Sequence, residues 1–290
     1  MHPVARATAP DWTAAMRAGD HGLAWQISEA ALAARDPATR DDPRLPYHLR
    51  WVWDGTPPDG CEVLVRCYHG LGDCLQFARY LPELARRAAS VTVEVSPRLH
   101  CLFDGLPVSL APFDPARPLP RSACDIEIME LGFALRMTPG DAPAQWLAAE
   151  GFRFPAGCVG LCLSAGDWDS GRSVPAELFH ATGMQRPCIA LDLGRTALPV
   201  LNPGGCPEDM AATAAFVAGC EVVVTVDTMI AHLAGSLGKP CWLMLRHEPD
   251  WRWVPGAQDS AWYPSLRLVH QDVSGDWAPV VARVRNEVGL

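Results

Sequence analysis

Two short segments carry polar residues where an apolar run gives way to a helical pattern, which is where open α/β sheets bind their ligands. The first segment is His69-Gly70-Leu71-Gly72-Asp73. Its two glycines allow the backbone to approach a ligand closely, and Asp73 falls in the first turn of the following helix. Asp73 is therefore either a carboxylate base that faces a cleft or only the cap of that helix, and the spacing fits both.

The second segment is Asp227-Thr228, which directly follows the β-branched run 222–226. Thr228 can cap the next helix, and the exposed amides of Thr228 and Met229 could then bind a diphosphate. His232 lies four residues after Thr228 on the same helical face. It is either a ligand contact or a buried structural histidine, and the spacing does not decide between them.

A third candidate is the polar loop 164–173, which begins at Ser164 and contains Arg172. A loop arginine after a strand can clamp a phosphate, or it can lie on a solvated surface. The sequence has no H-E-x-x-H, no clustered His and Cys and no G-x-S-x-G, so metal catalysis and a serine hydrolase have little support. The first segment is not a G-x-G-x-x-G fingerprint, so a dinucleotide cofactor is not indicated.

Two series of alternating strands and helices must position these segments, which is the pattern of parallel sheets with helices on their faces. The first series runs from a strand at 62–67 to one at 125–129, and the second from 158–163 to 266–270. A break falls near 144–155. Two α/β domains of similar size, with a cleft between them, are therefore expected.

The two ends of the chain differ from this pattern. Residues 1–46 lack strand signals and predict two helices, 11–18 and 21–35, as an appendage packed on the next domain. Further helices are expected at 176–182 and over 276–290, and the last could cross back to the N-terminal domain. Four late aromatic residues are expected to pack rather than to bind a ligand: Trp251, Trp253, Trp262 and Tyr263.

Composition narrows the class of protein. The 49% hydrophobic and 20% charged residues are typical of a soluble globular protein. No apolar run reaches the roughly 18 residues of a spanning helix, and the N-terminus has no signal-peptide pattern. A cytoplasmic protein is expected, with peripheral membrane contact left open. The net charge of −9 argues against non-specific nucleic-acid binding, and the 11 scattered cysteines are expected to be reduced core residues.

Residues 69–84, HGLGDCLQFARYLPEL, resemble the N-terminal signature of the heptosyltransferase-like (family 9) glycosyltransferases. They are most similar to the version fused to tetratricopeptide repeats in bacterial proteins. Residues 224–245, VTVDTMIAHLAGSLGKPCWLML, resemble the donor-site signature of that group. Three shorter segments resemble its C-terminal part in the same order: 249–253 (PDWRW), 262–267 (WYPSLR) and 275–280 (GDWAPV).

The resemblance implies a GT-B fold: a helical appendage over 1–46, an acceptor domain over 47–150, a nucleotide-sugar donor domain over 151–275 and the helix at 276–290. It also implies metal-independent, inverting sugar transfer from a nucleotide-diphosphate sugar to a hydroxyl of a bacterial glycan or protein, with no cofactor. Asp73 falls where the family places its general base.

The remaining candidates take their implied roles from the same match. His69, Gly70 and Gly72 form the loop on the acceptor side. The implied donor-site residues are Asp227, Thr228, Met229, His232, Arg172 and Ser164, with Arg172 near the leaving diphosphate.

One departure from the family pattern affects the donor loop. Relatives usually carry W-A-G-N-P here, then a histidine and R-S-I-P, whereas residues 164–175 read SAGDWDSGRSVP, with Asp167-Trp168 in place of Asn-Pro. An acid near a diphosphate is unfavourable unless it is paired. The alternative hypothesis is therefore a catalytically degenerate relative that serves as a nucleotide-binding or assembly module. A nucleotide-sugar epimerase or hydrolase is a third hypothesis.

Overall fold

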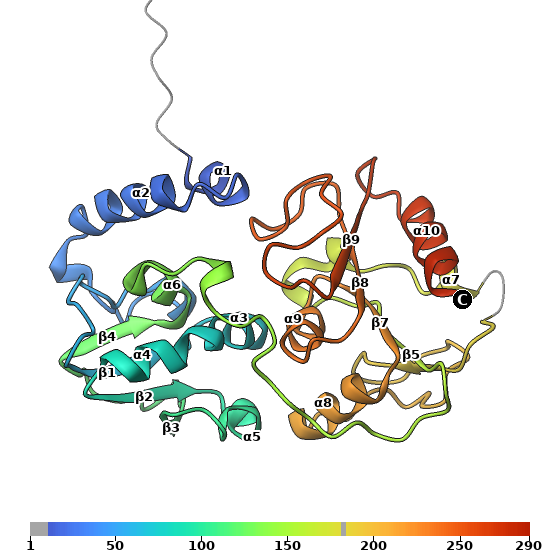
Figure 1. Cartoon of the computed structure of the whole chain (residues 1–290), viewed down its shortest axis with the longest axis horizontal. Coiled ribbons are helices and arrows are strands. Elements are labelled where there is room, and N and C mark those ends of the chain that lie inside the picture. The colour runs from blue at the N-terminus through green and yellow to red at the C-terminus, as the bar shows by residue number, and fades with distance from the viewer. Residues whose placement is uncertain (1–10, 181–183) are drawn as a thin grey trace, which may run out of the picture.

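Two α/β units make up the chain, with a helical pair lying over the first unit (Figure 1). The computed structural model describes residues 11–180 and 184–290. The first unit contains a four-stranded sheet in the order β3-β2-β1-β4, and the second a five-stranded sheet in the order β6-β5-β7-β8-β9. Every strand pairs with its neighbours in parallel, so the predicted α/β architecture with two parallel sheets is confirmed.

The first sheet is built around β1, which pairs with β2 on one side and β4 on the other. The helix that follows Asp73 is divided into α3 and α4 by a 3-10 turn, because Pro82 in the first turn of α4 has no amide to donate. The elements are β1 (Glu62–Arg66), α3 (Leu71–Phe77), α4 (Leu81–Arg87), β2 (Ser90–Val95), α5 (His100–Phe103), β3 (Ser109–Pro112), β4 (Cys124–Glu127), η5 (Ile128–Glu130) and α6 (Leu131–Leu135).

The second sheet is built around β7, whose five residues are all buried, as expected for a parallel strand with helices on both faces. The helix expected at 176–182 is present as α7 up to residue 180, and residues 181 and 182 lie outside the described part of the chain. The elements are β5 (Val159–Cys162), η7 (Asp167–Arg172), α7 (Glu177–His180), β6 (Cys188–Ala190), α8 (Met210–Gly219), β7 (Val222–Val226), α9 (Met229–Ser236), β8 (Cys241–Leu245), β9 (Leu266–His270) and α10 (Ala278–Val288).

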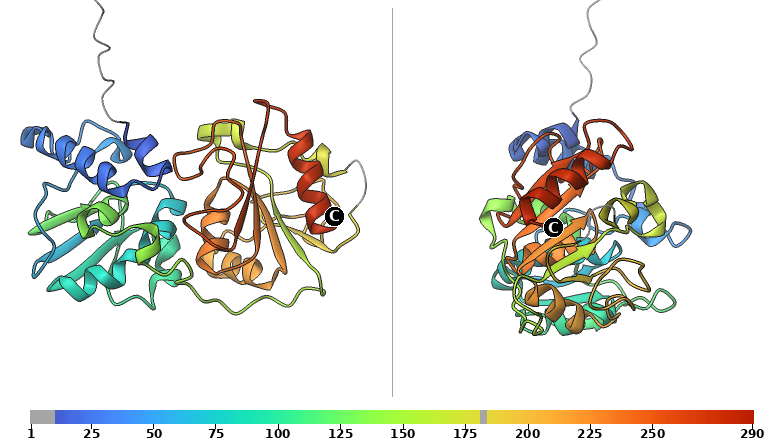
Figure 2. Two further views of the ribbon diagram at one scale, coloured as in Figure 1. Left: turned by 45° about the horizontal axis from the view of Figure 1, so that its top comes forward. Right: turned by 90° about the vertical axis from the view of Figure 1, so that its right-hand side faces the viewer.

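A long connecting segment runs from the first unit to the second along one side of the molecule, where the sequence predicted a break (Figure 2). This segment touches the helices of both units. The indole N–H of Trp146 donates to the Leu75 carbonyl on α3 (3.1 Å), and its backbone N–H donates to the Ser236 carbonyl on α9 (3.2 Å). The connection therefore fastens the two units together rather than only tethering them.

The N-terminal helices α1 (Trp12–Arg17) and α2 (His21–Ala33) break where the sequence predicts. Gly19 adopts φ +71°, and the Asp20 side chain caps α2 by accepting from the Leu23 amide (3.0 Å). The pair packs on α6 through Trp25 and Phe133, whose ring centroids lie 5.8 Å apart. A single helical hairpin thus buries its apolar face on the neighbouring unit.

The C-terminal helix does not follow the route back to the N-terminal domain that the sequence left open. Instead α10 packs on α7, β8 and β9 of the second unit. The reason is its apolar face, because Val280, Val281 and Val284 are buried in the same cluster as strands of the second sheet.

All eleven cysteines are free and most are buried, which agrees with reduced core residues. Among the described helices, none is both long and apolar enough to cross a membrane.

A buried ion network crosses the first sheet. The Arg66 guanidinium on β1 lies 2.5 Å from Glu94 Oε2 on β2 and 3.5 Å from Asp125 Oδ1 on β4. It also donates to the carbonyls of Leu119 and Pro120, which holds the segment before β4 against the strands. All three charged side chains are at most 2% exposed, so each depends on the others for compensation.

Replacing Arg66 by alanine is expected to destabilise the first unit by about 3–5 kcal/mol, because two buried carboxylates lose their partner. Urea unfolding followed by circular dichroism measures this. Arg86→Ala serves as the control, since Arg86 pairs with Glu83 on the surface with 72% of its side chain exposed. Its loss should leave the unfolding midpoint nearly unchanged. Equal effects of the two substitutions would contradict the role given to the buried network.

Candidate active site at the junction of the two units

The helices α3 and α9 begin directly after the central strands β1 and β7, and they pack against each other across the junction (Figure 1). Gly72 makes this approach possible. A Cβ atom at Gly72 would lie 2.8 Å from His232 Cδ2 and 3.4 Å from Met229 Cα. The close backbone approach expected at this glycine is therefore made by the opposite helix.

Asp73 caps α3, one of the two roles that its spacing allowed, and its role as a base stays a prediction. Its Oδ2 accepts from the Gly70 amide (3.0 Å), so it caps α3 together with Gly70 at the N-cap position. Its Oδ1 pairs with the guanidinium of Arg252, which belongs to the second unit. The carboxylate thus reaches across the junction, and 24% of the side chain stays exposed.

Arg252 is the main site residue that sequence reasoning missed. Besides Asp73, it donates from Nε to Gln76 Oε1 (2.5 Å) and from Nη1 to Asp250 Oδ1 (2.9 Å). Burial opposes its charge, but Asp73 and Asp250 outweigh burial, so the pKa of Arg252 is raised. The only available signal was its place in the segment PDWRW, because nothing in the spacing separates it from the other arginines.

His69 follows β1 and pairs with a carboxylate that the sequence did not single out. Its Nδ1 lies 2.9 Å from Oε1 of Glu127, the last residue of β4, and Glu127 Oε2 accepts from the Met129 amide (2.7 Å). Burial disfavours a charged imidazole, but the hydrogen bond and charge of Glu127 outweigh it, so the pKa of His69 is raised. The two residues meet because β1 and β4 are neighbours and parallel strands end at one edge.

On the second unit, the structure brings Arg172 to Asp227. Arg172 Nη1 donates to the Asp227 carbonyl (2.5 Å) and lies 4.0 Å from its Oδ2. Burial raises the pKa of the Asp227 carboxyl, and the nearby charge of Asp250 adds to the effect. The loop 164–173 is thereby held against the end of β7.

The donor loop contains a paired acid. Asp169 Oδ2 lies 3.6 Å from Arg172 Nε and 2.9 Å from Arg246 Nη1, so its charge is compensated. Asp167 and Trp168, the two residues that depart from the family pattern, belong to η7, and their side chains lie outside what the structure describes. Arg246, which follows β8, is a second arginine near the loop that the sequence did not single out.

Ser164 is held through its backbone. Its amide donates to Asp192 Oδ1 (2.8 Å), and the Leu163 amide donates to Asp192 Oδ2 (2.9 Å). Asp192 follows β6 and was also missed, although a carboxylate directly after a strand is the kind of signal used for Asp227. The exposed Ser164 side chain leaves the donor contact implied for it as a prediction.

Thr228 caps α9 as expected, because its Oγ1 accepts from the Ile230 amide (3.3 Å). The amides of Thr228 and Met229 stand at the start of the helix, where the backbone offers them no intrahelical acceptor. Both residues are partly exposed. They begin a helix at the junction where Met229 approaches Gly72, and the anion binding expected of such a terminus stays a prediction.

His232 has the contacts of a buried structural histidine. It is 6% exposed, its Nδ1 lies 3.1 Å from the Tyr263 hydroxyl, and its ring stacks on Trp253 at 5.8 Å. Burial, reinforced by neighbouring arginines such as Arg252, holds the pKa of His232 well below its usual value. The imidazole is neutral at physiological pH, and its contact with a donor stays a prediction.

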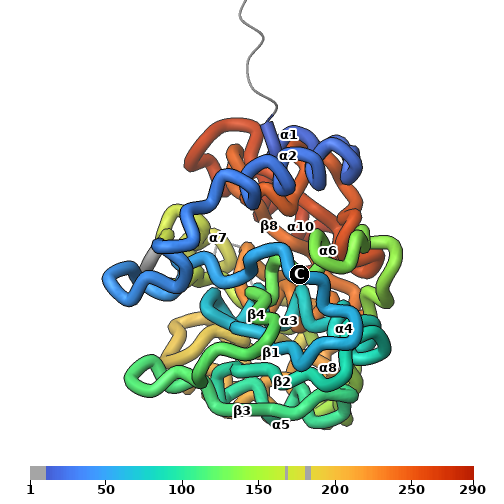
Figure 3. The backbone as a smooth tube through the Cα atoms, turned by 90° about the vertical axis from the view of Figure 1, so that its left-hand side faces the viewer, coloured from blue at the N-terminus to red at the C-terminus, as the bar shows by residue number. Residues whose placement is uncertain are grey.

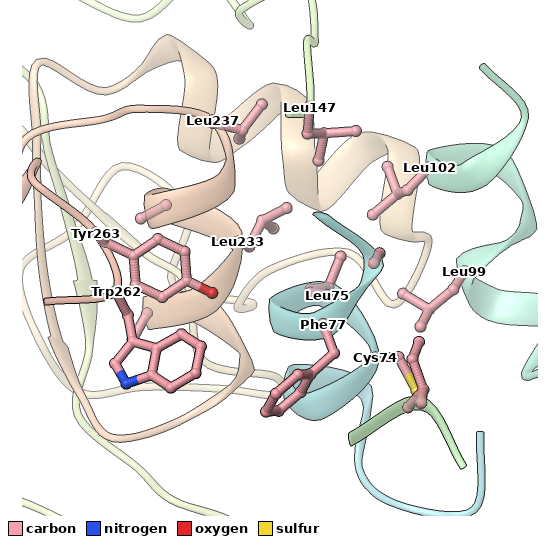
Figure 4. Close-up of a cluster of buried hydrophobic side chains, with 14 of the residues drawn as sticks. Cys74, Leu75, Phe77, Leu99, Leu102, Leu147, Leu233, Leu237, Trp262 and Tyr263 are labelled. Atoms are coloured by element: carbon pink, nitrogen blue, oxygen red, sulfur yellow. The ribbon is translucent and has the colours of Figure 1, made fainter. Parts of the chain in front are cut away.

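Three of the four late aromatic residues are buried and pack, as predicted, and Trp251 is only partly buried. Trp253 and Tyr263 are 0% exposed and Trp262 is 5% exposed. Trp262 lies against Phe77 of α3, with ring centroids 5.7 Å apart, next to Tyr263 and Leu233 (Figure 4). They therefore fasten the first unit to the second, and the C-terminal helix is not part of this cluster.

Within residues 11–180 and 184–290, no group of three or more His, Cys, Asp or Glu side chains is arranged to hold a metal ion.

Comparisons with known proteins identify the fold. No family model and no curated protein sequence matches the chain. Among solved structures, a family 9 glycosyl transferase from Veillonella parvula matches 81% of this chain and 90% of its own, with TM-score 0.54 and 10% identity. TibC, an iron-containing dodecameric glycosyltransferase from enterotoxigenic Escherichia coli, matches 80% and 76%, with TM-score 0.54 and 12% identity.

A third similar structure is the E. coli ADP-heptose LPS heptosyltransferase II. It matches 78% of this chain and 98% of its own, with TM-score 0.50 and 14% identity. These likenesses confirm the GT-B-like fold that the sequence resemblance implied.

Gly72→Ala is expected to destabilise the protein by about 1–3 kcal/mol, because the added methyl group would overlap His232 and press on the α9 backbone. Thermal unfolding measures the loss. Gly105→Ala is the matched control, since a Cβ there would meet nothing within 4 Å. In a His232→Ala background the further cost of Gly72→Ala should be smaller, because the ring that the methyl group overlaps is gone. If Gly72→Ala matches Gly105→Ala, the two helices do not depend on this contact.

His69 is expected to titrate above about 6.5 in the folded protein. Since the folded pKa is raised, the pairing with Glu127 contributes stability that is full below about 6.5 and is lost as pH rises through the folded pKa. Glu127→Gln should lower the pKa of His69, because burial is then no longer outweighed by the charge of Glu127. NMR titration of the imidazole resonances measures both. Glu62→Gln, at the exposed opposite end of β1, should change nothing, and an unchanged His69 in Glu127→Gln would refute the assignment.

Proposed function

We propose that this protein is a metal-independent, inverting glycosyltransferase that moves a sugar from a nucleotide-diphosphate sugar to a hydroxyl of a bacterial glycan or protein. The observation that carries the proposal is the Asp73 carboxylate, fixed by Arg252 at the junction where α3 meets the N-terminus of α9. The first unit thus supplies a base for the acceptor hydroxyl, and the second supplies a site for the leaving diphosphate. Inverting transfer requires both.

Asp73 acts as the general base. As the acceptor oxygen attacks C1 of the donor sugar, the carboxylate takes the hydroxyl proton and the bond from C1 to the diphosphate oxygen breaks. Each carboxylate oxygen has two lone-pair directions, so one remains on each oxygen after the bonds to Gly70 and Arg252. Arg252 holds the carboxylate at the junction through their ion pair.

The leaving diphosphate gains negative charge as the bond breaks. The amides of Thr228 and Met229, with the α9 dipole, stabilise that charge without a metal ion. Arg172 holds the Asp227 carbonyl and sets the position of this turn, and Arg246 adds a partly exposed positive charge beside the loop. Asp227 and His232 shape the floor of the donor site, His232 as a neutral packing group.

The acceptor side is formed by the loop from His69 to Gly72. His69, held by Glu127 and 29% exposed, is placed to hydrogen-bond an acceptor oxygen next to Asp73. The third similar structure is named for ADP-heptose, so ADP-linked sugars are the first donors to test.

The donor is tested by calorimetric titration of the purified protein with ADP, UDP, GDP and CDP in the presence of EDTA. One of these diphosphates is expected to bind, and the corresponding nucleotide sugars then enter transfer assays with hydroxyl acceptors. If none of the four diphosphates binds, the proposal that this protein uses a nucleotide-sugar donor is wrong.

Asp73→Asn is expected to lower the transfer rate by about 10²–10⁴-fold and to leave the Kd for the nucleotide diphosphate nearly unchanged, because the base is lost and the anion site is kept. Asp209→Asn is the matched control, since Asp209 also caps a helix, α8, through a 2.8 Å bond to the Ala212 amide. It should retain full activity.

Two other outcomes of this experiment favour the rival hypotheses. Nucleotide binding without any Asp73-dependent transfer identifies the chain as a catalytically degenerate nucleotide-binding module. Product formation from the donor alone, without acceptor, identifies an epimerase or a hydrolase.

A further inference from the structure

A cavity of about 320 Å³ lies between the N-terminal helices and the first unit, and its lining includes Phe77 and Trp251, whose rings also contact the Arg252 guanidinium. The helices α1 and α2 lie over α6 and α3 there (Figure 3). Its walls are largely aromatic and come from three parts of the chain: Trp12 and Trp25 of the helical pair, Phe77, Tyr80 and Phe133 of the first unit, and Trp251 and Trp262 of the second.

The cavity shares two walls with the Asp73–Arg252 pair. The Arg252 guanidinium lies 4.6 Å from the ring centroid of Trp251 and 5.8 Å from that of Phe77. Phe77 also lies one turn after Asp73 on the same face of α3. A molecule in the cavity is therefore within one or two side chains of the proposed base.

Residues of the second unit complete the cavity. Trp12 packs edge-on against Trp251 with centroids 4.9 Å apart, and Trp251 packs on Trp262 at 5.7 Å. Arg17 donates to the Pro249 carbonyl (2.8 Å). The helical pair thus bridges both units above the junction, and the cavity exists only where all three parts meet.

The cavity lining has few polar groups, and most of them already hydrogen-bond to other residues of the protein. Ser28 accepts from the Trp12 indole N–H (3.1 Å), and Arg35 donates to the Trp53 carbonyl and to Glu130 Oε1, both at 2.8 Å. Glu130 Oε2 is buried and has no hydrogen-bond partner among the described residues. Burial raises the pKa of this carboxyl, against the opposing charge of Arg35.

The small number of unpaired polar groups in the cavity lining favours an apolar ligand. A sugar in such a cavity would leave most of its hydroxyls without hydrogen-bond partners, which is unfavourable for each buried hydroxyl. A hydrocarbon or aryl group loses no hydrogen bonds and gains the contact with the aromatic walls. Glu130 Oε2, which has no partner among the described residues, could accept one hydrogen bond from a donor on the hydrocarbon or aryl group.

We propose that this cavity is the subsite for the aglycone of an amphiphilic acceptor, which carries an apolar chain or ring with one hydrogen-bond donor. The inference rests on the proposed transferase function. The acceptor hydroxyl sits at Asp73, and the apolar part enters between Phe77 and Trp251 and lies under α2. The N-terminal helical pair is then a substrate-binding element, since it supplies one wall of the subsite.

The test uses N-phenyl-1-naphthylamine, an uncharged aryl amine with one N–H donor whose fluorescence rises in an apolar site. It is titrated into the full-length protein. Ala31→Trp fills the cavity from α2 and should weaken binding at least tenfold. Ala30→Trp is the matched control, because Ala30 is the equally exposed neighbour that does not line the cavity, and it should bind as the parent does.

Met129→Trp fills the same cavity from the first unit and covers the case in which Ala31→Trp fails to fold. Dodecyl maltoside below its micellar concentration should displace the probe, and maltose should not. Unaltered probe binding in both cavity-filling variants, or displacement by a tryptophan-containing peptide but not by dodecyl maltoside, overturns the inference.

Transfer assays separate this inference from the function on which it rests. Ala31→Trp is expected to lower kcat/KM for an alkyl glycoside acceptor at least tenfold and to leave the nucleotide Kd unchanged. Asp73-dependent transfer without probe binding overturns the aglycone subsite alone. Probe binding in the cavity without nucleotide binding overturns the transferase function, and the acceptor role falls with it.

Discussion

The contact between α3 and α9 sets the geometry on which the rest of the site depends. Two helices can approach this closely only if one of them lacks a side chain at the crossing, and Gly72 meets that requirement against the ring of His232. The contact brings the first turns of both helices to one junction. A carboxylate and a helix terminus from different units thereby become neighbours, which no arrangement within a single unit would achieve.

The charge of Arg252 affects both the carboxylates and the histidine at this junction. Arg252 is buried with two aspartates around it, and its field, together with burial, keeps His232 neutral. A neutral His232 can pack on Trp253 and accept or donate one hydrogen bond to Tyr263 without desolvating a charge. Removing Arg252 would therefore leave Asp73 without its partner across the junction and would alter the titration of His232 as well.

The helical pair at the N-terminus contacts both units of the molecule. One hairpin cannot form a repeat array, so its apolar face must be covered by something else. Here it lies on α6 and reaches Trp251 of the second unit. The same aromatic residues that fasten the units together also form the cavity wall, so domain junction and proposed acceptor subsite share one packing cluster.

The sequence by itself determined the two parallel α/β series, the break between the N-terminal helices and the placement of Asp73 and Thr228 at helix starts, because strand composition, capping and glycine chemistry act over a few residues. It could not supply Arg252 or Glu127, whose partners lie 179 and 58 positions away. Nor could it decide that α10 stays on the second sheet, since that depends on which apolar surface remains uncovered. Only the tertiary structure brings Gly72 against His232, because a contact between distant helices follows from how the two units dock and leaves no local pattern in the chain.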